Sequence, residues 1–350
     1  MAEEKEEGKI ETETPTEVKE VKKATKKVTK KKEEKEAQLI DLPGVGPGAV
    51  AKLEAAGIFD LMGLAVLTPP NLSTLSGMSE SVARKAIQAA RQMMNLGFQD
   101  GLAYVEKRKE IGRITTGSKN LDNLLGGRGL ETKAITEAFG AFGSGKTQLA
   151  HSLAVGVQLP EEQGGCNGKA VYIDTEGTFR PERIIQFAEG INATPEKVLK
   201  NILVARAFNS DHQMLLLDKV SELIKDGEPI KLIIVDSLTA HFRAEYAGRG
   251  QLADRQQRLN RYLHQLQKVA EQYNIAIYVT NQVMSDPAQM FGDPTKAIGG
   301  NIVGHACTFR IYIRRGKKDS RVAKLIDSPN LPDNETVFMV ETDGLKDVAI

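Results

Sequence analysis

The sequence predicts an α/β fold, a mostly parallel twisted sheet with an antiparallel extension, preceded by a small all-helical domain. A glycine-rich GAFGSGKT segment at 140–147 lies between an apolar run and a helical pattern, which is the context of a phosphate-binding loop. From residue 111 onward apolar runs alternate with helical patterns, as is typical of parallel strands covered on both faces. Before them, residues 39–95 read as short apolar helices broken by glycine.

Length and composition limit the class of protein. The 350 residues are enough for about two domains, and a hydrophobic content of 41% supports a buried core. No apolar run could cross a membrane and no secretory signal is visible, so we expect a soluble, cytoplasmic protein. Cys166 and Cys307 indicate neither a disulfide framework nor a zinc site, and we expect both to be buried. With a net charge of +1, DNA binding requires locally arranged Lys and Arg.

The composition divides the chain into four parts. Residues 1–38 are almost entirely Glu, Lys, Thr and Val, which predicts a disordered tail; the alternative is a lysine-rich arm at 22–32 that contacts DNA phosphates. Residues 39–95 form the helical domain and 96–112 a charged linker. The α/β core then occupies 113–350.

The helical domain contains two helix–turn–helix units. LPGVGPG at 42–48 precedes a helical pattern at 49–56 and looks like a helix-hairpin-helix, whose amides and helix N-terminus can hold a DNA phosphate. The unit around Gly77, before a helix at 79–94, is a weaker match. The alternative is a small bundle whose glycines only end helices. In the linker, Phe98 is a candidate docking side chain, unless it packs on its own small domain.

The core reads as a series of strands and helices. Strands are predicted at 134–139, 170–174, 202–208, 231–236 and 275–283, with helices at 148–158, 181–190, 212–225 and 251–273. Shorter links join the last strands, at 308–313, 321–326 and 336–341, and the turn at 316–320 predicts an antiparallel hairpin that extends the sheet.

The phosphate loop indicates binding of a nucleoside triphosphate. Its glycines allow backbone dihedrals that bring N–H groups to phosphate oxygens. Lys146 can reach the β- and γ-phosphates, and the Thr147 hydroxyl can ligate Mg²⁺. The predicted cofactor-binding residues are Gly140, Ala141, Phe142, Gly143, Ser144, Gly145, Lys146, Thr147 and Gln148.

Three further polar residues follow predicted strands. Asp236 ends an apolar run at the edge where doubly wound sheets bind ligands, so it is expected to hold Mg²⁺ together with Thr147. Glu176 can orient the attacking water, while Asp174 is interpreted as a cap. The neutral amide of Gln282 can contact the γ-phosphate, which makes it a candidate nucleotide sensor.

Eight segments carry a family resemblance. They are GAFGSGKTQ, DTEGTFRPER, ARAFNSDHQ, LIIVDS, HFRAEYAGRG, TNQV, DPTKAIGGN and DSPNLP, in this order behind the helix-hairpin-helix. Together they resemble the archaeal RadA recombinases, relatives of the eukaryotic strand-exchange recombinases and of bacterial RecA, from about residue 39 to the end. The resemblance implies a RecA-like core and a DNA-dependent ATPase that forms filaments on single-stranded DNA and exchanges strands in recombination and repair.

The resemblance also implies cofactors, partners and residue roles. ATP and Mg²⁺ would be the cofactors; single- and double-stranded DNA, further copies of the chain and mediator proteins would be the partners, at the nucleoid. Lys146, Glu176 and Gln282 would be catalytic, and Thr147 and Asp236 would bind the metal. Arg180 would stack on adenine, and Asp327, Ser328 and Pro329 would cap the ATP of a neighbouring protomer.

Two DNA-binding loops are implied in the same way. Arg243, Tyr246 and Arg249 lie in the region of the first, and residues 285–300 in that of the second; Val283, Gly299 and Gly300 are further candidate DNA-binding residues. The first segment combines Arg and Tyr after a predicted strand, and the second is a long loop containing Gly, Pro and Asp; both are common in DNA-binding loops. The alternative is that they are ordinary loops with surface arginines.

Two positions depart from the family pattern. Ala141 stands where Glu is usual, which should not disturb phosphate binding because backbone amides do that work. Gly101 stands where the linker motif, which starts at Phe98 and inserts into the next subunit, has Ala; the missing methyl group is worth about 0.8 kcal/mol of burial. Either assembly is weaker, or Leu102 or Ala103 fills the socket.

Other functions remain open from the sequence. A recombinase paralogue could act as a regulatory protein that binds DNA or another recombinase, and a ring helicase could share the core. The intact Lys146, Glu176 and Gln282 favour an active ATPase over the first, and the helix-hairpin-helix argues against the second.

Overall fold

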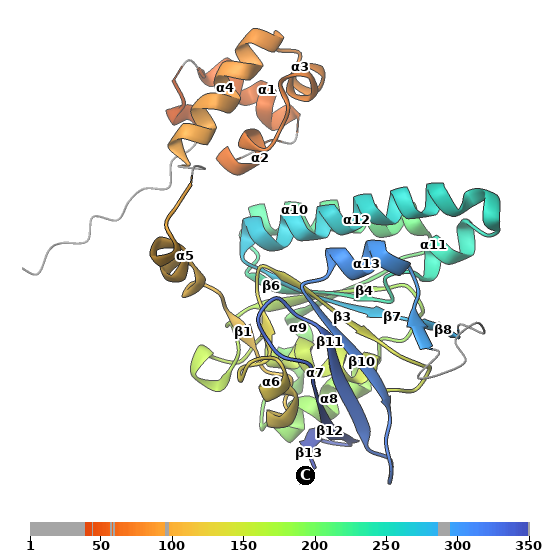
Figure 1. Ribbon diagram of the computed structural model, residues 1–350. Coiled ribbons are helices and arrows are strands. Elements are labelled where there is room, and N and C mark those ends of the chain that lie inside the picture. Colours follow the sequence, from red (N-terminus) through yellow and green to blue (C-terminus); the bar gives the residue numbers. More distant parts are fainter. Residues whose placement is uncertain are drawn as a thin grey trace, which may run out of the picture. The chain divides into compact units, whose positions relative to one another are not determined.

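The computed structural model describes residues 39–348, except 44, 57, 59, 95–97 and 286–294 (Figure 1). The expected tail at 1–38 lies outside the described residues. Two compact units divide the chain, Met1–Phe98 and Gln99–Ile350. Among the described helices, none combines the length and apolarity of a membrane span.

In its described residues, the first unit has four α-helices after a 3₁₀ turn, η1 (Leu39–Asp41). They are α1 (Pro47–Ala55), α2 (Leu61–Ala65), α3 (Pro69–Ser76) and α4 (Glu80–Met93). Proline occupies the first turn of α1 and of α3, where no amide donor is needed. Gly77 ends α3 in a left-handed conformation, with φ of 65°. Leu53, Leu64 and Leu72 are fully buried between these helices.

The second unit is built on a nine-stranded sheet in the order β13-β12-β11-β10-β3-β7-β6-β4-β5. The strands are β3 (Ala134–Phe139), β4 (Lys169–Asp174), β5 (Ile202–Arg206), β6 (Ile230–Asp236), β7 (Ala276–Asn281), β10 (Phe309–Arg315), β11 (Arg321–Asp327), β12 (Asn334–Glu341) and β13 (Gly344–Asp347). From β10 to β5 every neighbouring pair is parallel, whereas β10 to β13 are antiparallel. The predicted fold class, including the antiparallel extension, is confirmed.

Helices cover both faces of this sheet. One face carries α6 (Lys119–Leu124), α7 (Lys146–Gly156), α8 (Pro181–Gly190) and α9 (Pro195–Lys200); the other carries α10 (Ser210–Lys225), α11 (Ala240–Glu245), α12 (Leu252–Tyr273) and α13 (Gly300–Ala306). Alternate strand residues supply the two cores, so Tyr172 packs on the first face and Ile173 on the second. Such strands must be apolar throughout, which explains their continuous runs.

Several predicted boundaries were wrong. The strand predicted at 275–283 ends at Asn281, and β8 (Val283–Ser285) instead pairs with β9 (Thr295–Ala297) in a separate antiparallel ribbon. The base of the expected second loop is therefore a ribbon, and its residues 286–294 lie outside the described part. The linker contains α5 (Gly101–Arg108), because Asp100 accepts a hydrogen bond from the Ala103 amide at its start. Cys307 is buried as expected, whereas Cys166 is only half-buried.

Short elements escaped the sequence analysis. They are β1 (Arg113–Ile114), β2 (Leu130–Glu131), α6, α9, η2 (Glu161–Gln163), α11, η3 (Arg249–Gln251), α13 and β13. Each has at most seven residues, which is too few for a hydrophobic period to appear.

A buried ion pair joins the central strand to the antiparallel extension. Glu137 on β3 is fully buried, and its carboxylate accepts Arg310 Nε from β10 at 2.7 Å and Asn281 Nδ2 from β7 at 2.7 Å. A carboxylate in this position has no water to replace a lost partner.

We therefore expect Arg310→Met to destabilise the core by about 3–5 kcal/mol, because it leaves the Glu137 charge buried without its cation. Amide hydrogen exchange of β3, β7 and β10 measures this loss. The matched control is Lys219→Ala, which breaks an exposed pair with Glu222 and should cost under about 1 kcal/mol. Equal losses for the two variants would contradict the assigned role of the buried pair.

Candidate active site

A cavity of about 980 Å³ opens where β3, β6 and β7 end. Its walls come from segments far apart in the sequence, because parallel strands deliver their carboxyl ends to one edge of the sheet. The residues that line it include Gly143, Lys146, Thr147, Glu176, Arg183, Asp236, Ser237, Gln282, Arg315 and Arg321.

The glycine-rich loop has a backbone that only glycine permits. Gly143 and Gly145 have φ of 73° and 108°. At Gly140 a side-chain carbon would lie 2.0 Å from the Ile313 carbonyl oxygen. The loop leads directly into α7, whose first-turn amides face its ligand side.

Lys146 folds over the loop that precedes it. Its Nζ donates to the carbonyl oxygens of Gly140 at 2.8 Å and Ala141 at 3.0 Å. Burial lowers the pKa of Lys146, and the nearby Asp236 and Glu176 carboxylates oppose that shift. Because its hydrogen bonds to the loop are to neutral carbonyls, Lys146 can turn toward a phosphate without breaking a salt bridge.

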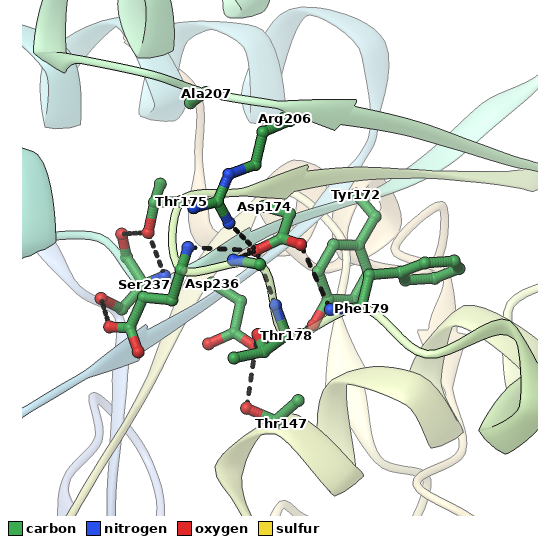
Figure 2. A network of polar contacts seen from close by, with 12 residues as sticks. Thr147, Tyr172, Asp174, Thr175, Thr178, Phe179, Arg206, Ala207, Asp236 and Ser237 are labelled. Carbon is green, nitrogen blue, oxygen red and sulfur yellow. Dashed lines mark hydrogen bonds and ion pairs between the residues drawn. The ribbon is translucent and has the colours of Figure 1, made fainter.

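Asp236 accepts hydrogen bonds from hydroxyl groups of four segments, and Figure 2 labels three of the donor residues, Thr147, Tyr172 and Thr178. Its carboxylate accepts Thr147 Oγ1 at 2.8 Å, Tyr172 OH at 2.8 Å and Thr178 Oγ1 at 3.2 Å, and also Thr280 Oγ1. These donors come from α7, β4, the loop after β4, and β7. The carboxylate is therefore fixed at the cavity wall, next to the Thr147 hydroxyl.

This pair of oxygen donors fits Mg²⁺. The ion prefers hard oxygen ligands and usually keeps several waters, binding one or two protein groups together with substrate phosphates. Within the described residues there is no cluster of three or more His, Cys, Asp or Glu that could form an all-protein metal site. Thr147 and Asp236 thus suit a metal that is shared with a nucleotide.

Asp174 organises the loop that carries Glu176. Its two carboxylate oxygens accept the amides of residues 176–179 at 2.7–3.2 Å, and Arg206 Nη1 from β5 at 3.2 Å. Figure 2 shows these bonds converging on one side chain. Asp174, at the end of β4, therefore holds the backbone of this loop, as a cap does.

Glu176 itself points to the cavity. Its Oε1 accepts Ser237 Oγ at 2.6 Å and Gln282 Nε2 at 2.8 Å. Gln282 Oε1 in turn accepts Arg243 Nη1 from α11 at 3.4 Å. The structure thus brings together the predicted catalytic carboxylate, the predicted sensor and one residue of the first predicted DNA loop.

Other predicted residues lie elsewhere. Arg180 donates to the carbonyl oxygens of Gly177 and Phe179, at 2.9 and 2.8 Å, and is not part of the cavity lining. Asp327 ends β11, and Ser328 Oγ accepts the Leu331 amide at 2.7 Å. The segment of Asp327, Ser328 and Pro329 does not line the cavity of its own chain.

The remaining predicted DNA-binding residues lie at the ends of four elements. Tyr246 follows α11, and the centre of its ring lies 5.5 Å from Arg258 Cζ. Arg249 begins η3. Val283 begins β8 and lines the cavity. Gly299 and Gly300 begin α13 with φ of 97° and 61°.

Four residues of this region were missed in the sequence. Ser237 follows Asp236 and could have been suspected from its place after the strand. Arg183 lines the cavity three residues after Arg180, and its Nε donates to Gln148 Oε1 at 2.6 Å. Arg315 and Arg321 arrive from the β10–β11 hairpin. Nothing in the sequence signalled the positions of these arginines, since they depend on packing between distant segments.

His151 was missed as well. This buried ring contacts the Thr147 carbonyl oxygen through Nδ1 at 2.8 Å and accepts the Arg180 amide at Nε2 at 3.2 Å. Burial lowers the pKa of His151, which favours the neutral ring that this pair of contacts requires. It therefore links α7 to the start of α8.

Comparison with family models gives two matches. The Rad51 model matches residues 107–348, more than half of the chain. The SAM-like helix-hairpin-helix tandem model matches residues 36–92, a span that includes both predicted helix–turn–helix units.

Replacing Lys146 with Ala should abolish tight nucleotide binding, because the variant lacks the cavity-lining amine that we expect to reach the β- and γ-phosphates. Titration calorimetry with ATP and Mg²⁺ measures the effect, for which we expect a loss of at least about a hundredfold in affinity, on the order of 3 kcal/mol. Lys219→Ala, on the exposed side of α10, is the control. An unchanged affinity in Lys146→Ala would mean that the loop does not hold the phosphates.

Proposed function

The chain belongs to the Rad51 family, and from this we propose that it is a DNA-dependent ATPase that forms helical filaments on single-stranded DNA and catalyses homologous pairing and strand exchange. Family membership supports a recombinase that binds ATP and DNA in general. The order of the eight sequence segments supports the archaeal RadA branch as our more specific proposal. The observation that carries the proposed activity is the 2.8 Å contact between Glu176 and Gln282 beside the pair of Thr147 and Asp236.

ATP hydrolysis follows from the arrangement of these side chains. The amides of the phosphate loop and Lys146 bind the phosphates, while Thr147 and Asp236 would hold Mg²⁺, which neutralises phosphate charge when bound. Glu176 orients the attacking water through its carboxylate, and Ser237 fixes the direction of that carboxylate. Gln282 reports whether a γ-phosphate is present.

DNA binding is proposed for segments next to this site. Arg243 contacts Gln282, and the β8–β9 ribbon begins one residue after Gln282. A change at the γ-phosphate can therefore be transmitted to both proposed DNA loops. We propose a second contact with DNA backbone phosphates for residues 39–95, supported by the helix-hairpin-helix match.

Assembly into filaments is proposed for the linker at 96–112. Phe98 is fully exposed, and Leu102, on α5, is 81% exposed. A side chain at Gly101 would meet open space, so no contact with another described residue requires glycine at this position. On the second unit, β5 is an edge strand, and the exposed apolar Phe208 follows it. An extended segment of another copy could pair with this edge as an additional strand of the sheet. The segment of Asp327, Ser328 and Pro329 would then cap the neighbour's nucleotide.

The proposal as a whole is tested by electron microscopy of the full chain with ATP, Mg²⁺ and single-stranded DNA, together with a strand-exchange assay. Helical filaments and strand exchange are the expected result. A protein that binds DNA and ATP but forms no filaments and exchanges no strands would instead be a regulatory paralogue.

Glu176→Gln should slow DNA-stimulated ATP hydrolysis by about a hundredfold or more while ATP affinity stays within a few-fold, because the shape of the side chain is kept and the charge that orients water is lost. Single-turnover hydrolysis and calorimetry separate the two quantities. Wild-type turnover in this variant would require another group to orient the water.

Phe98→Glu should abolish filaments and most DNA-stimulated ATPase activity in a folded protein, because it places a charge on the proposed docking side chain. The specific ATPase rate is measured against protein concentration, with and without single-stranded DNA. Val66→Glu, at another exposed apolar position of the first unit, should behave as wild type. Full activity in a monomeric Phe98→Glu variant would exclude a nucleotide site completed at the interface.

A further inference from the structure

Two arginines face each other across the hairpin beside the phosphate loop. Arg315 is the last residue of β10 and Arg321 the first of β11, and they are direct partners in the antiparallel register. Directly opposed residues project on the same face of a sheet, and like charges in that position repel. Both residues line the nucleotide cavity. The hairpin therefore directs two positive charges toward one place.

Their contacts provide no counter-charge. Arg315 Nε donates to the Gly143 carbonyl oxygen at 3.4 Å, and Arg321 Nη1 donates to the carbonyl oxygens of Asp319 and Ser320 at 2.6 and 3.0 Å. Arg321 Nε is buried and has no hydrogen-bond acceptor among the described residues. Among the described residues, no carboxylate oxygen lies within 4.0 Å of the guanidinium nitrogens of Arg315 or Arg321.

Neighbouring arginines of the same strand differ in this respect. Arg310 pairs with Glu137 at 2.7 Å, and Arg314 pairs with Glu335 at 3.6 Å. Strand β10 thus gives carboxylate partners to the arginines that do not line the cavity and none to the one that does. A guanidinium that lacks an anionic partner in a concave site favours binding of an anion there.

The position on the loop indicates which part of a nucleotide is bound. A side-chain carbon at Gly143 would lie 2.5 Å from Arg315 Nη2, and one at Gly145 would lie 3.6 Å from Arg321 Cγ. These glycines belong to the stretch whose amides cradle the α- and β-phosphates, whereas Glu176 and Gln282 gather at the γ-phosphate end. The arginines therefore lie beside the phosphates that ADP and ATP share.

We propose that Arg315 and Arg321 are nucleotide-binding residues that hold the α- and β-phosphates of ADP and ATP alike. This inference rests on the proposed function, since it assumes that the cavity binds a nucleotide. Their contribution is independent of the γ-phosphate. They retain the diphosphate after hydrolysis, while Gln282 distinguishes the two nucleotides.

Calorimetry on the full chain tests this proposal with Mg²⁺ and either ADP or ATP, in the Glu176→Gln background so that ATP is not consumed. Arg321→Gln and Arg315→Gln should each weaken both nucleotides by about tenfold, which is about 1.4 kcal/mol, and leave the ratio of the two affinities unchanged. Arg321→Lys should fall between wild type and Arg321→Gln. Arg314→Gln, the adjacent arginine that pairs with Glu335, is the matched control and should stay within about twofold.

Thermal unfolding provides a second readout that a purely structural role would not give. Without nucleotide, Arg321→Gln should unfold at the wild-type temperature or above it, because it removes one of two opposed like charges. The increase in unfolding temperature on adding ADP should shrink. A variant that is destabilised without nucleotide and keeps the full ADP-induced increase would contradict the proposal.

Three further results would bear on the assignment of the two arginines. If both arginine variants keep their affinity for ADP and ATP, the guanidinium groups do not bind the nucleotide; a loss of DNA affinity alone would instead assign them to DNA phosphates. A loss of affinity for ATP but not for ADP would place the two arginines at the γ-phosphate and overturn their assignment to the α- and β-phosphates. If wild type binds nucleotides without DNA-stimulated turnover, the proposed function fails while the result for the arginines still stands.

Discussion

The carboxylate of Asp236 is the point on which the site depends. It is almost completely buried at the end of β6, and it satisfies its oxygens with hydroxyl groups from α7, β4, the loop after β4, and β7. Removing a buried carboxylate would leave several buried hydroxyl donors without an acceptor, which costs more than any one of the bonds contributes. One residue therefore ties α7 and the loop after β4 to strands that the sheet already holds together, and the proposed metal ligands are held in place before a nucleotide binds.

The strand ends were the predictable part of this protein. Continuous apolar runs predicted β3, β4, β6 and β7, and the polar residues that follow such runs meet at one edge of the sheet. For that reason Thr147, Glu176, Asp236 and Gln282 could be brought together from the sequence, and the structure places them around one cavity. Asp174 could be interpreted as a cap because it stands at a strand end before a glycine-containing turn.

Residues that reach the cavity through tertiary packing could not be predicted. Arg183 and Arg180 differ by three positions at the start of α8, and only the packing of α8 on α7 decides which one lines the cavity. Arg321 comes from a hairpin far along the chain, and its place beside Gly145 depends on the parallel pairing of β10 with β3. The ribbon of β8 and β9 was missed because apolar residues resume at Val283 and Met284 after the polar residues 280–282, although the exposed Met284 shows that the buried strand has ended.

The attachment of the β8–β9 ribbon supports the proposed coupling between nucleotide and DNA. Its first strand begins directly after Gln282, and Ile298, just beyond its second strand, donates its amide to the Gln282 carbonyl oxygen at 3.0 Å. The Ile298 carbonyl oxygen accepts Asn281 Nδ2 at 2.6 Å, and the same amide donates to the buried Glu137. Both ends of the ribbon are thus held by neighbouring residues: Gln282, which contacts Glu176, and Asn281, which is bonded to the buried Glu137. In the proposed recombinase, a shift of Gln282 from Glu176 toward a γ-phosphate would move the start of the ribbon relative to Asn281, which is bonded to the buried Glu137. If DNA binds the ribbon or Arg243 as proposed, it would bias the position of Gln282 through the same contacts, because coupling between two binding sites is reciprocal.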